Sequence, residues 1–175
     1  NESAITGKGN DVAGIVAEQQ NAGSVKNCTN RGEIRNNTAS YGTAGIVGWI
    51  RYNGATKDYP VKNVIEVTGN TNYGKVSGGN DAGGIVGTVY NLGKVNDNKN
   101  FAPSLQAATF AAGIVGNAQF TETAVGLDLQ NSVEVKNNVS TTALDQMTVN
   151  GTCKDLYVYI NNQEYVTAEN NRNAE

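Results

Sequence analysis

Residues 44–48 read Ala-Gly-Ile-Val-Gly, and close copies of this pentapeptide occupy residues 13–17, 83–87 and 112–116. The glycine at its second position recurs after 31, 39 and then 29 residues. A period in this range is typical of repeat proteins, in which similar supersecondary units stack on one another. The sequence therefore predicts a solenoid in which each unit buries its apolar face against its neighbours.

The length and composition fit one elongated domain built from strands. In a chain of 175 residues, about four units are enough to form a continuous core. Gly occupies 21 positions and Pro only 2, which indicates many sharp turns that need unusual backbone angles. No segment keeps the apolar spacing of a helix for about ten residues without an interrupting Gly or Asn. We therefore expect an all-β fold.

The charge pattern argues against nucleic acid as a partner. The net charge is −3, the sequence pI is about 5.0, and no run of Lys or Arg reaches three residues. No apolar stretch approaches the roughly 20 residues that a transmembrane helix needs, so no transmembrane segment is predicted. Because the first residue is Asn1 rather than Met, the sequence by itself leaves the cellular location open.

The two cysteines are expected to remain free thiols. Cys28 falls in the first unit and Cys153 after the fourth, and stacked strands lie about 4.8 Å apart, so three layers would separate them by roughly 14 Å. A disulfide cannot reach across that distance. Two small apolar fillers are the simplest interpretation. Since the chain has no His, we predict neither a metal site nor a cofactor.

A second motif, Asn-x-Gly-x-(Val/Ile), marks the corners of the units at residues 21–25, 30–34, 72–76 and 91–95. Asn tolerates the left-handed backbone region and Gly enters it freely, so we expect a tight corner at each copy. The β-branched residue two positions later is expected to begin a strand. Three short strands per unit would then give a triangular coil.

Side-chain alternation along the pentapeptide predicts which residues face the core. The isoleucines are expected to stack in one inward column, made of Ile15, Ile46, Ile85 and Ile114. The valines that follow them are then expected to point outward, namely Val16, Val47, Val86 and Val115. An exposed ladder of valines would be an interaction or aggregation surface, so we expect a neighbouring domain or the chain's own insertions to cover it.

The units differ in their insertions and at the C-terminal end. Residues 51–60 are predicted to form a protruding loop, and residues 100–112 to fold back over the valine ladder. We assign residues 1–140 to the repeats and residues 141–175 to a C-terminal β cap and tail of the same domain. The cap is expected to be a strand and a hairpin that block the last open edge.

The pentapeptide, together with the Asn- and Cys-containing turn of residues 27–34, resembles the GLUG repeat. This repeat is found in secreted and surface proteins of bacteria, including the non-catalytic regions of IgA-specific metallopeptidases. The resemblance covers about residues 9–138 and implies a parallel right-handed β-helix (β-solenoid) of about four coils. It also implies an extracellular or cell-surface location. In the first unit Ala17 replaces the closing Gly, and the third and fourth units lack the Asn-Cys element.

The acidic residues do not suggest a reaction centre, and we predict no catalytic residue. Without His, proton transfer would fall to Asp, Glu, Lys or Tyr, and glycoside cleavage would need two facing carboxylates. Glu33 and Lys75 occupy equivalent outward places and are expected to form a charge-compensated surface column. The Asn-Asp pairs at residues 10–11 and 80–81 are expected to form turns, because calcium needs more oxygen ligands than one such pair provides.

The only tryptophan marks the predicted binding site. Alternation from Ile46 places Trp49 and Arg51 on the outer face, and Tyr52 and Tyr59 lie on the adjoining loop. Aromatic side chains beside an Arg suit a sugar ring or a protein hot spot, so we predict that these four residues contact a glycan or a partner protein. The alternative, somewhat favoured because an isolated exposed Trp is uncommon, is that the loop buries Trp49 in a satellite core.

These observations favour a non-catalytic structural or adhesive module of a bacterial cell-surface or secreted protein. Its expected partners are a host or cell-surface glycan or protein and the neighbouring domains of a longer surface protein. One alternative is a substrate-positioning domain of a surface peptidase or glycosidase. The other is a polysaccharide-active enzyme, since parallel β-helices also occur in polysaccharide lyases and hydrolases.

Overall fold

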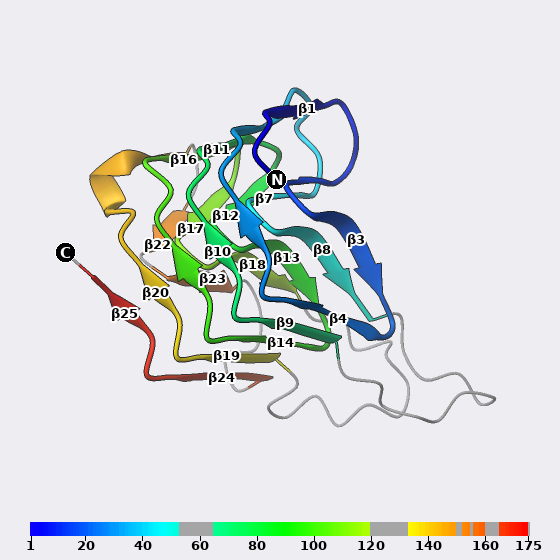
Figure 1. Ribbon diagram of the computed structural model, residues 1–175, viewed down its shortest axis with the longest axis vertical. Helices are drawn as coiled ribbons and strands as arrows, with labels where there is room; N and C mark the ends of the chain where they lie inside the picture. Colours follow the sequence, from blue (N-terminus) through cyan, green and yellow to red (C-terminus); the bar gives the residue numbers. More distant parts are fainter. Residues whose placement is uncertain (53–64, 120–132, 150–151, 155, 160–164, 175) are drawn as a thin grey trace.

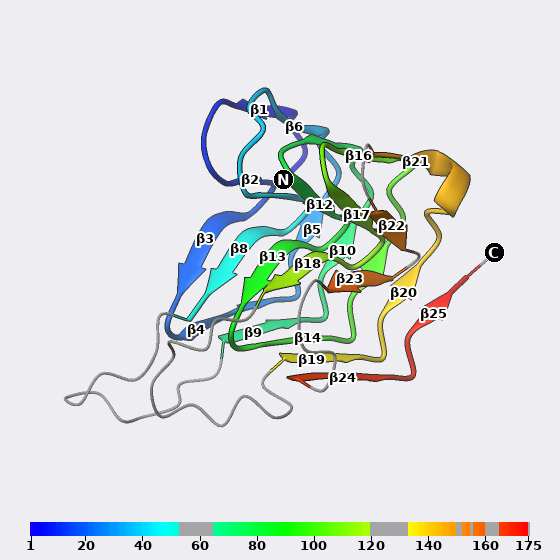
Figure 2. The same ribbon diagram turned by 180° about the vertical axis from the view of Figure 1, so that it is seen from behind.

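The computed structural model describes residues 1–52, 65–119, 133–149, 152–154, 156–159 and 165–174. These residues form short strands and one 3-10 turn, η1 (Leu144–Gln146). The strands follow one another in five coils of five strands each, and the coils lie side by side along one axis (Figures 1 and 2).

Every coil runs through the same five strand positions in the same order. The first coil has β1 (Ile5–Gly7), β2 (Val12–Ala13), β3 (Val16–Gln20), β4 (Gly23–Lys26) and β5 (Thr29–Asn30). The second has β6 (Ile34–Asn36), β7 (Gly42–Ala44), β8 (Val47–Arg51), β9 (Ile65–Thr68) and β10 (Thr71–Asn72). The third has β11 (Val76–Gly78), β12 (Asp81–Gly83), β13 (Val86–Tyr90), β14 (Gly93–Asn96) and β15 (Lys99–Asn100). The fourth has β16 (Leu105–Ala107), β17 (Phe110–Ala112), β18 (Val115–Gln119), β19 (Val133–Lys136) and β20 (Val139–Ser140). The fifth has β21 (Met147–Val149), β22 (Thr152–Lys154), β23 (Tyr157–Tyr159), β24 (Val166–Glu169) and β25 (Arg172–Asn173).

Strands at the same position of successive coils pair into five parallel sheets. We call these the first to fifth sheets, and their orders are β1-β6-β11-β16-β21, β2-β7-β12-β17-β22, β3-β8-β13-β18-β23, β4-β9-β14-β19-β24 and β5-β10-β15-β20-β25. The pairing stays in register from coil to coil, as in Ile34 opposite Val76 and Val76 opposite Leu105. This architecture confirms the predicted all-β, parallel β-solenoid.

The repeated pentapeptide forms a corner between two sheets. In the second coil Ala44 ends β7, Gly45 and Ile46 make the bend, and Val47 begins β8. Ile46 and Val47 are both fully buried in the same apolar cluster. The prediction that the valines point outward is therefore wrong, because side chains alternate only within a strand and a bend separates these two residues. No cover over a valine ladder is needed.

The isoleucine column is confirmed in the coils that have neighbours on both sides. Ile46, Ile85 and Ile114 are 0% exposed, and all three belong to the cluster that fills the solenoid between the third and fourth sheets. Ile15, in the first coil, is only half-buried because it lies at the end of the stack. A second, smaller cluster backs the first and second sheets and contains Val76, Ala82, Ala102, Leu105, Ala107, Ala111 and Met147.

The glycine of the pentapeptide is required by a close approach between coils. A Cβ atom on Gly45 would lie 2.4 Å from the carbonyl oxygen of Gly84 and 2.2 Å from the side chain of Asn72. At that distance the backbones of adjacent coils would have to move apart. The recurrence of Gly at this position is thus a consequence of strand stacking rather than of backbone torsion.

The corner between the fourth and fifth sheets has a residue in the left-handed region in every coil. The φ angles are 55° at Asn27, 69° at Gly69, 57° at Asp97, 56° at Asn137 and 54° at Asn170. Asn, Asp and Gly are the residues that adopt this region most easily. The corner that recurs in the sequence is therefore a left-handed residue followed, after the first coil, by an Asn, which is buried at Asn70, Asn98 and Asn138 and half-buried at Asn171.

The predicted Asn-x-Gly corners exist, but they arise for two different reasons. Asn21 and Asn91 have φ of 58° and 67°, as a tight corner requires. Asn30 and Asn72, in contrast, are buried strand residues, and Asn30 Nδ2 donates to Asn72 Oδ1 at 2.9 Å. This second pair belongs to a ladder of side-chain amides that runs along the solenoid.

The C-terminal residues form a fifth coil, so the predicted capping hairpin is wrong. β21 to β25 pair parallel with β16 to β20, and each continues one of the five sheets. The Asn170-Asn171 corner repeats Asn137-Asn138, and the amide of Asn138 donates to Asn171 Oδ1 at 3.0 Å. The C-terminal sequence has no clear copy of the pentapeptide, so the repeat search did not predict this coil. Its corner, however, keeps the pair of Asn residues.

The segment of residues 100–112 does not fold back over the solenoid as predicted. Leu105 lies in β16 and is only 1% exposed, and Phe110 begins β17 opposite Asp81. The segment is therefore an integral part of the fourth coil. Cys28 is a free thiol, as predicted, and Cys153 lies on β22 in the last coil.

Candidate functional site

The structure buries the tryptophan of the predicted binding site. Trp49 is 8% exposed, and Tyr52 is 3% exposed. Tyr41 stacks on Trp49 with 4.7 Å between ring centroids, and the Arg51 guanidinium lies 4.8 Å from the centroid on the same indole. Tyr59 lies outside the described residues. The prediction that Trp49 stands on the surface is therefore wrong.

The burial of Trp49 agrees with the alternative interpretation, but most of the loop of residues 51–60 that was expected to cover it lies outside the described residues. Tyr41, which precedes β7, covers the indole, and Tyr90 of the next coil meets it edge-on with 6.2 Å between centroids. Tyr41 itself is 44% exposed. Sequence alternation missed this contact because Tyr41 and Trp49 are brought together by the corner between the second and third sheets.

The two Asp residues of the Asn-Asp pairs serve the fold. Asp81 is buried between β12 and β13, and its Oδ2 accepts hydrogen bonds from Thr88 Oγ1 at 2.8 Å and Asn117 Nδ2 at 2.9 Å. Burial raises the pKa of Asp81, and these two hydrogen bonds oppose that rise. Asp11 Oδ1 accepts from the Gly42 backbone N–H at 3.1 Å.

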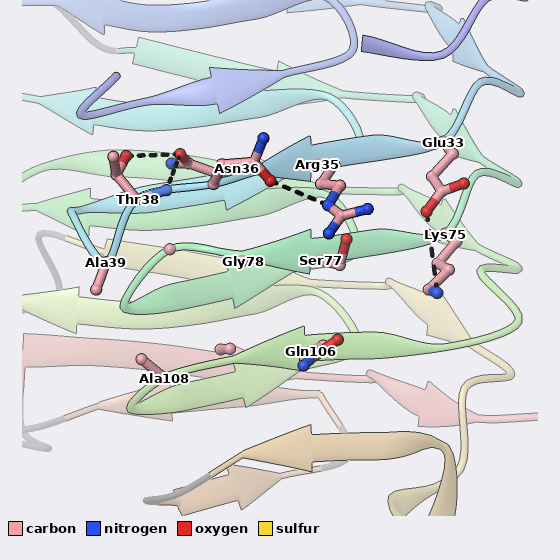
Figure 3. A pocket seen from close by; sticks show the side chains of 13 residues that line it. Glu33, Arg35, Asn36, Thr38, Ala39, Lys75, Ser77, Gly78, Gln106 and Ala108 are labelled. Carbon is pink, nitrogen blue, oxygen red and sulfur yellow. Dashed lines mark hydrogen bonds and ion pairs between the residues drawn. The ribbon is translucent and has the colours of Figure 1, made fainter. Parts of the chain in front are cut away.

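A polar groove crosses the outer face of the first sheet (Figure 3). It has a volume of about 440 Å³ and spans β6, β11 and β16, hence three successive coils. The residues that line it are Glu33, Arg35, Asn36, Asn37, Thr38, Ala39, Lys75, Ser77, Gly78, Gly79, Gln106, Ala107 and Ala108. We take this surface, called the sheet-1 groove below, as the candidate functional site.

The hollow of the sheet-1 groove comes from a difference in side-chain size. Arg35 and Gln106 are exposed and lie on either side of Ser77, which has them as its register partners. The chain then continues through Gly78 and Gly79, which have no side chain to fill the space. Long side chains thus form the walls and a short run of small residues forms the floor.

Ion pairing and hydrogen bonding orient the charged groups of the sheet-1 groove. Lys75 Nζ lies 3.9 Å from Glu33 Oε1, which confirms the charge-compensated column that the sequence predicted. Arg35 Nε donates to Asn37 Oδ1 at 3.0 Å, and Figure 3 shows its guanidinium above Ser77. Two cations and one carboxylate line the groove, so its local charge is positive although the whole chain is acidic.

An aromatic pair lies beside the sheet-1 groove. Tyr73 stacks on Phe101 of the next coil with 5.3 Å between centroids. On the other side, Arg31 of the preceding coil lies 4.7 Å from the centroid of the Tyr73 ring. Tyr73 is 41% exposed and is two residues from Lys75 in the groove wall. The sequence gives no direct sign of this stack, since only the strand register aligns the two rings.

Neither a metal-binding cluster nor a membrane-spanning helix occurs among the described residues. Among them, no group of three or more His, Cys, Asp or Glu side chains lies close enough to hold a metal ion. None of the described helical segments is long and apolar enough to cross a membrane. No protein-family model, curated protein or solved structure matches the chain.

Proposed function

We propose that the chain is a non-catalytic structural and ligand-binding module of a bacterial cell-surface or secreted protein. The observation that carries the proposal is the sheet-1 groove, a polar surface held on three in-register coils. A solenoid is a suitable scaffold for such a surface, because stacked repeats give extended faces that bind long ligands. The resemblance to GLUG repeats supports the bacterial surface location.

The chemistry of the described acidic residues supports binding rather than catalysis. Among the described residues, Glu33 is the only carboxylate that lines the groove, and Lys75 pairs with it. Asp81 is occupied by Thr88 and Asn117, away from the groove. Glycoside cleavage needs two carboxylates that face each other across the substrate, and the groove lining offers one.

A glycan array and a pull-down from bacterial and host cell surfaces test this proposal. The purified chain should be retained by a glycan or a surface protein, and the bound glycan should be recovered at its original length. Heat-unfolded chain is the control for non-specific adhesion. Release of shortened glycan or cleaved protein by the purified chain would contradict the non-catalytic assignment, and absence of any retained ligand would contradict the binding role.

A further inference from the structure

The sheet-1 groove carries a regular row of outward residues along the solenoid axis. The strand register aligns one residue from each coil in this row, and its members are Thr6, Arg35, Ser77, Gln106 and Thr148. Successive members are about 4.8 Å apart, the spacing of adjacent strands. A linear polymer laid along the axis would therefore meet one side chain per coil. A pyranose unit in an extended glycan has a comparable length.

The charges in the groove suit a carboxylate. Asn37 accepts from Arg35 Nε, which fixes the guanidinium and, within the part of the chain that the structure describes, leaves its two terminal nitrogens for a ligand. Arg binds carboxylates in a two-pronged geometry that other cations cannot reproduce. Lys75 is 45% exposed and its Glu33 partner 49% exposed, so their long contact is weak and an incoming anion can compete with it.

The shape and polarity of the groove favour a sugar polymer over a protein. Protein hot spots are pockets for buried aromatic or aliphatic anchors. The floor here is formed by small residues such as Ser77, Gly78 and Ala108, which offer little apolar surface but allow a ring to approach the backbone closely. At the margin of the groove, Phe101 and Arg31 cover the two faces of the Tyr73 ring, so the 41% exposed Tyr73 offers its edge to a ligand.

We propose that the sheet-1 groove binds a linear polysaccharide whose units carry carboxylates, laid along the solenoid axis across β6, β11 and β16. Arg35 and Lys75 bind the carboxylates, Gln106 bonds sugar hydroxyls, and the exposed edge of Tyr73 contacts the ligand at the margin of the groove. This inference rests on the proposed binding function and adds the class of ligand and the residues that select it.

The test uses calorimetry of the whole chain with an oligogalacturonate hexamer as probe. The carboxyl-reduced hexamer, which has the same linkages without the charges, is the matched ligand control. The double variant Arg35→Gln with Lys75→Gln removes both cations and keeps polar side chains of similar length. The control pair Lys94→Gln with Lys99→Gln, on the fourth and fifth sheets, makes an equal change of charge elsewhere. The melting temperature of each variant checks that it folds.

The wild-type chain should bind the hexamer, and the carboxyl-reduced hexamer should bind at least about tenfold more weakly. The double variant should lose at least about tenfold in affinity, Tyr73→Ala a smaller factor, and the control pair almost nothing. Equal affinity for both hexamers would overturn the proposal. So would equal losses in the double variant and the control pair, since that would show general charge attraction.

The outcome is separable from that of the proposed function. If the hexamer fails to bind while the array still finds a ligand that the double variant retains, the groove assignment is wrong and the binding module stands. If the folded chain retains no ligand at all, both proposals fail. Preferential binding of a sulfated glycosaminoglycan over the hexamer would overturn the carboxylate assignment and leave the module intact.

Discussion

Asn98 donates its side-chain Nδ2 to Asn138 Oδ1 at 3.0 Å, and its backbone N–H donates to the same oxygen at 2.9 Å. Asn98 Nδ2 also donates to the Val67 carbonyl at 2.9 Å. Asn70 repeats the arrangement toward Asn98 one coil earlier. A buried amide that satisfies its own corner and the adjacent coil links the coils in a fixed register, because a slip would leave these groups without partners.

Asn98→Ala should therefore destabilise the fold strongly. The change leaves the backbone N–H of Asn70 and the Val67 carbonyl without their partners, and each buried unsatisfied group costs about 1–3 kcal/mol. We expect a loss of several kcal/mol in urea unfolding. Asn37→Ala is the control, since Asn37 is exposed and its side chain bonds only Arg35 among the described residues. Equal losses of stability at the two positions would show that the hydrogen-bonded row of Asn70, Asn98 and Asn138 has no special role.

Ile85→Ala and Val86→Ala should both destabilise the solenoid, because both side chains are 0% exposed. The isoleucine change should cost about 2–5 kcal/mol through the cavity that it leaves. The valine change should cost roughly 2 kcal/mol. Ile15→Ala, at the same place in the half-buried end coil, should cost less than Ile85→Ala. If Val86→Ala left the free energy of unfolding unchanged, Val86 would have to point outward, as the sequence predicted.

The single tryptophan should show blue-shifted fluorescence that resists quenching by iodide, because Trp49 is 8% exposed. Tyr41→Ala removes the ring that stacks on the indole, so its emission should shift to the red and become easier to quench. Tyr73→Ala removes a comparably exposed tyrosine from a different aromatic pair and should leave the emission unchanged. Unchanged emission in Tyr41→Ala would show that Tyr41 is not what covers Trp49.

Asp11 should make the stability of the fold depend on pH, because the pKa of its carboxyl is raised in the folded protein. Burial raises the pKa of Asp11 from 3.8 to about 6, against the hydrogen bond from the Gly42 N–H and with the help of nearby Glu18. Arg51 and Asp81 also act on it, in opposite directions. Since the folded pKa is the higher one, the native state binds more protons between about pH 4 and pH 6, and stability falls as pH rises through that window.

Asp11→Asn should remove this dependence. Its midpoint of unfolding should approach that of the wild type near pH 4, rise above it as the pH increases to about 6, and keep a constant advantage beyond. The Asn oxygen can still accept from the Gly42 N–H, so that contact is retained. If the unfolding midpoints of the wild type and Asp11→Asn differed by the same amount across this pH range, the raised pKa of Asp11 would be contradicted.

The repeat spacing and the Asn- and Gly-rich corners were sufficient to predict an all-β solenoid, and the resemblance to GLUG repeats implied that its strands are parallel. The spacing and the corners are both local signals. Gly is required at position 45 because a Cβ atom there would meet a backbone carbonyl of the next coil, and Asn suits position 137 because the backbone there is left-handed. Each requirement therefore recurs in the sequence as the same kind of residue. The pairing of Glu33 with Lys75 also followed from their equivalent places in successive units.

Only the tertiary structure decided which faces are buried and where the groove lies. The bend at Gly45 and Ile46 lets the side chains of both Ile46 and Val47 point into the core. Side chains alternate in direction only within a strand, so alternation does not predict their directions across this bend. Tyr41 covers Trp49 through a corner contact that no periodicity marks. The groove needs Arg35, Ser77 and Gln106 in one row, and that row exists only through strand register, which sequence spacing with variable loops leaves unfixed.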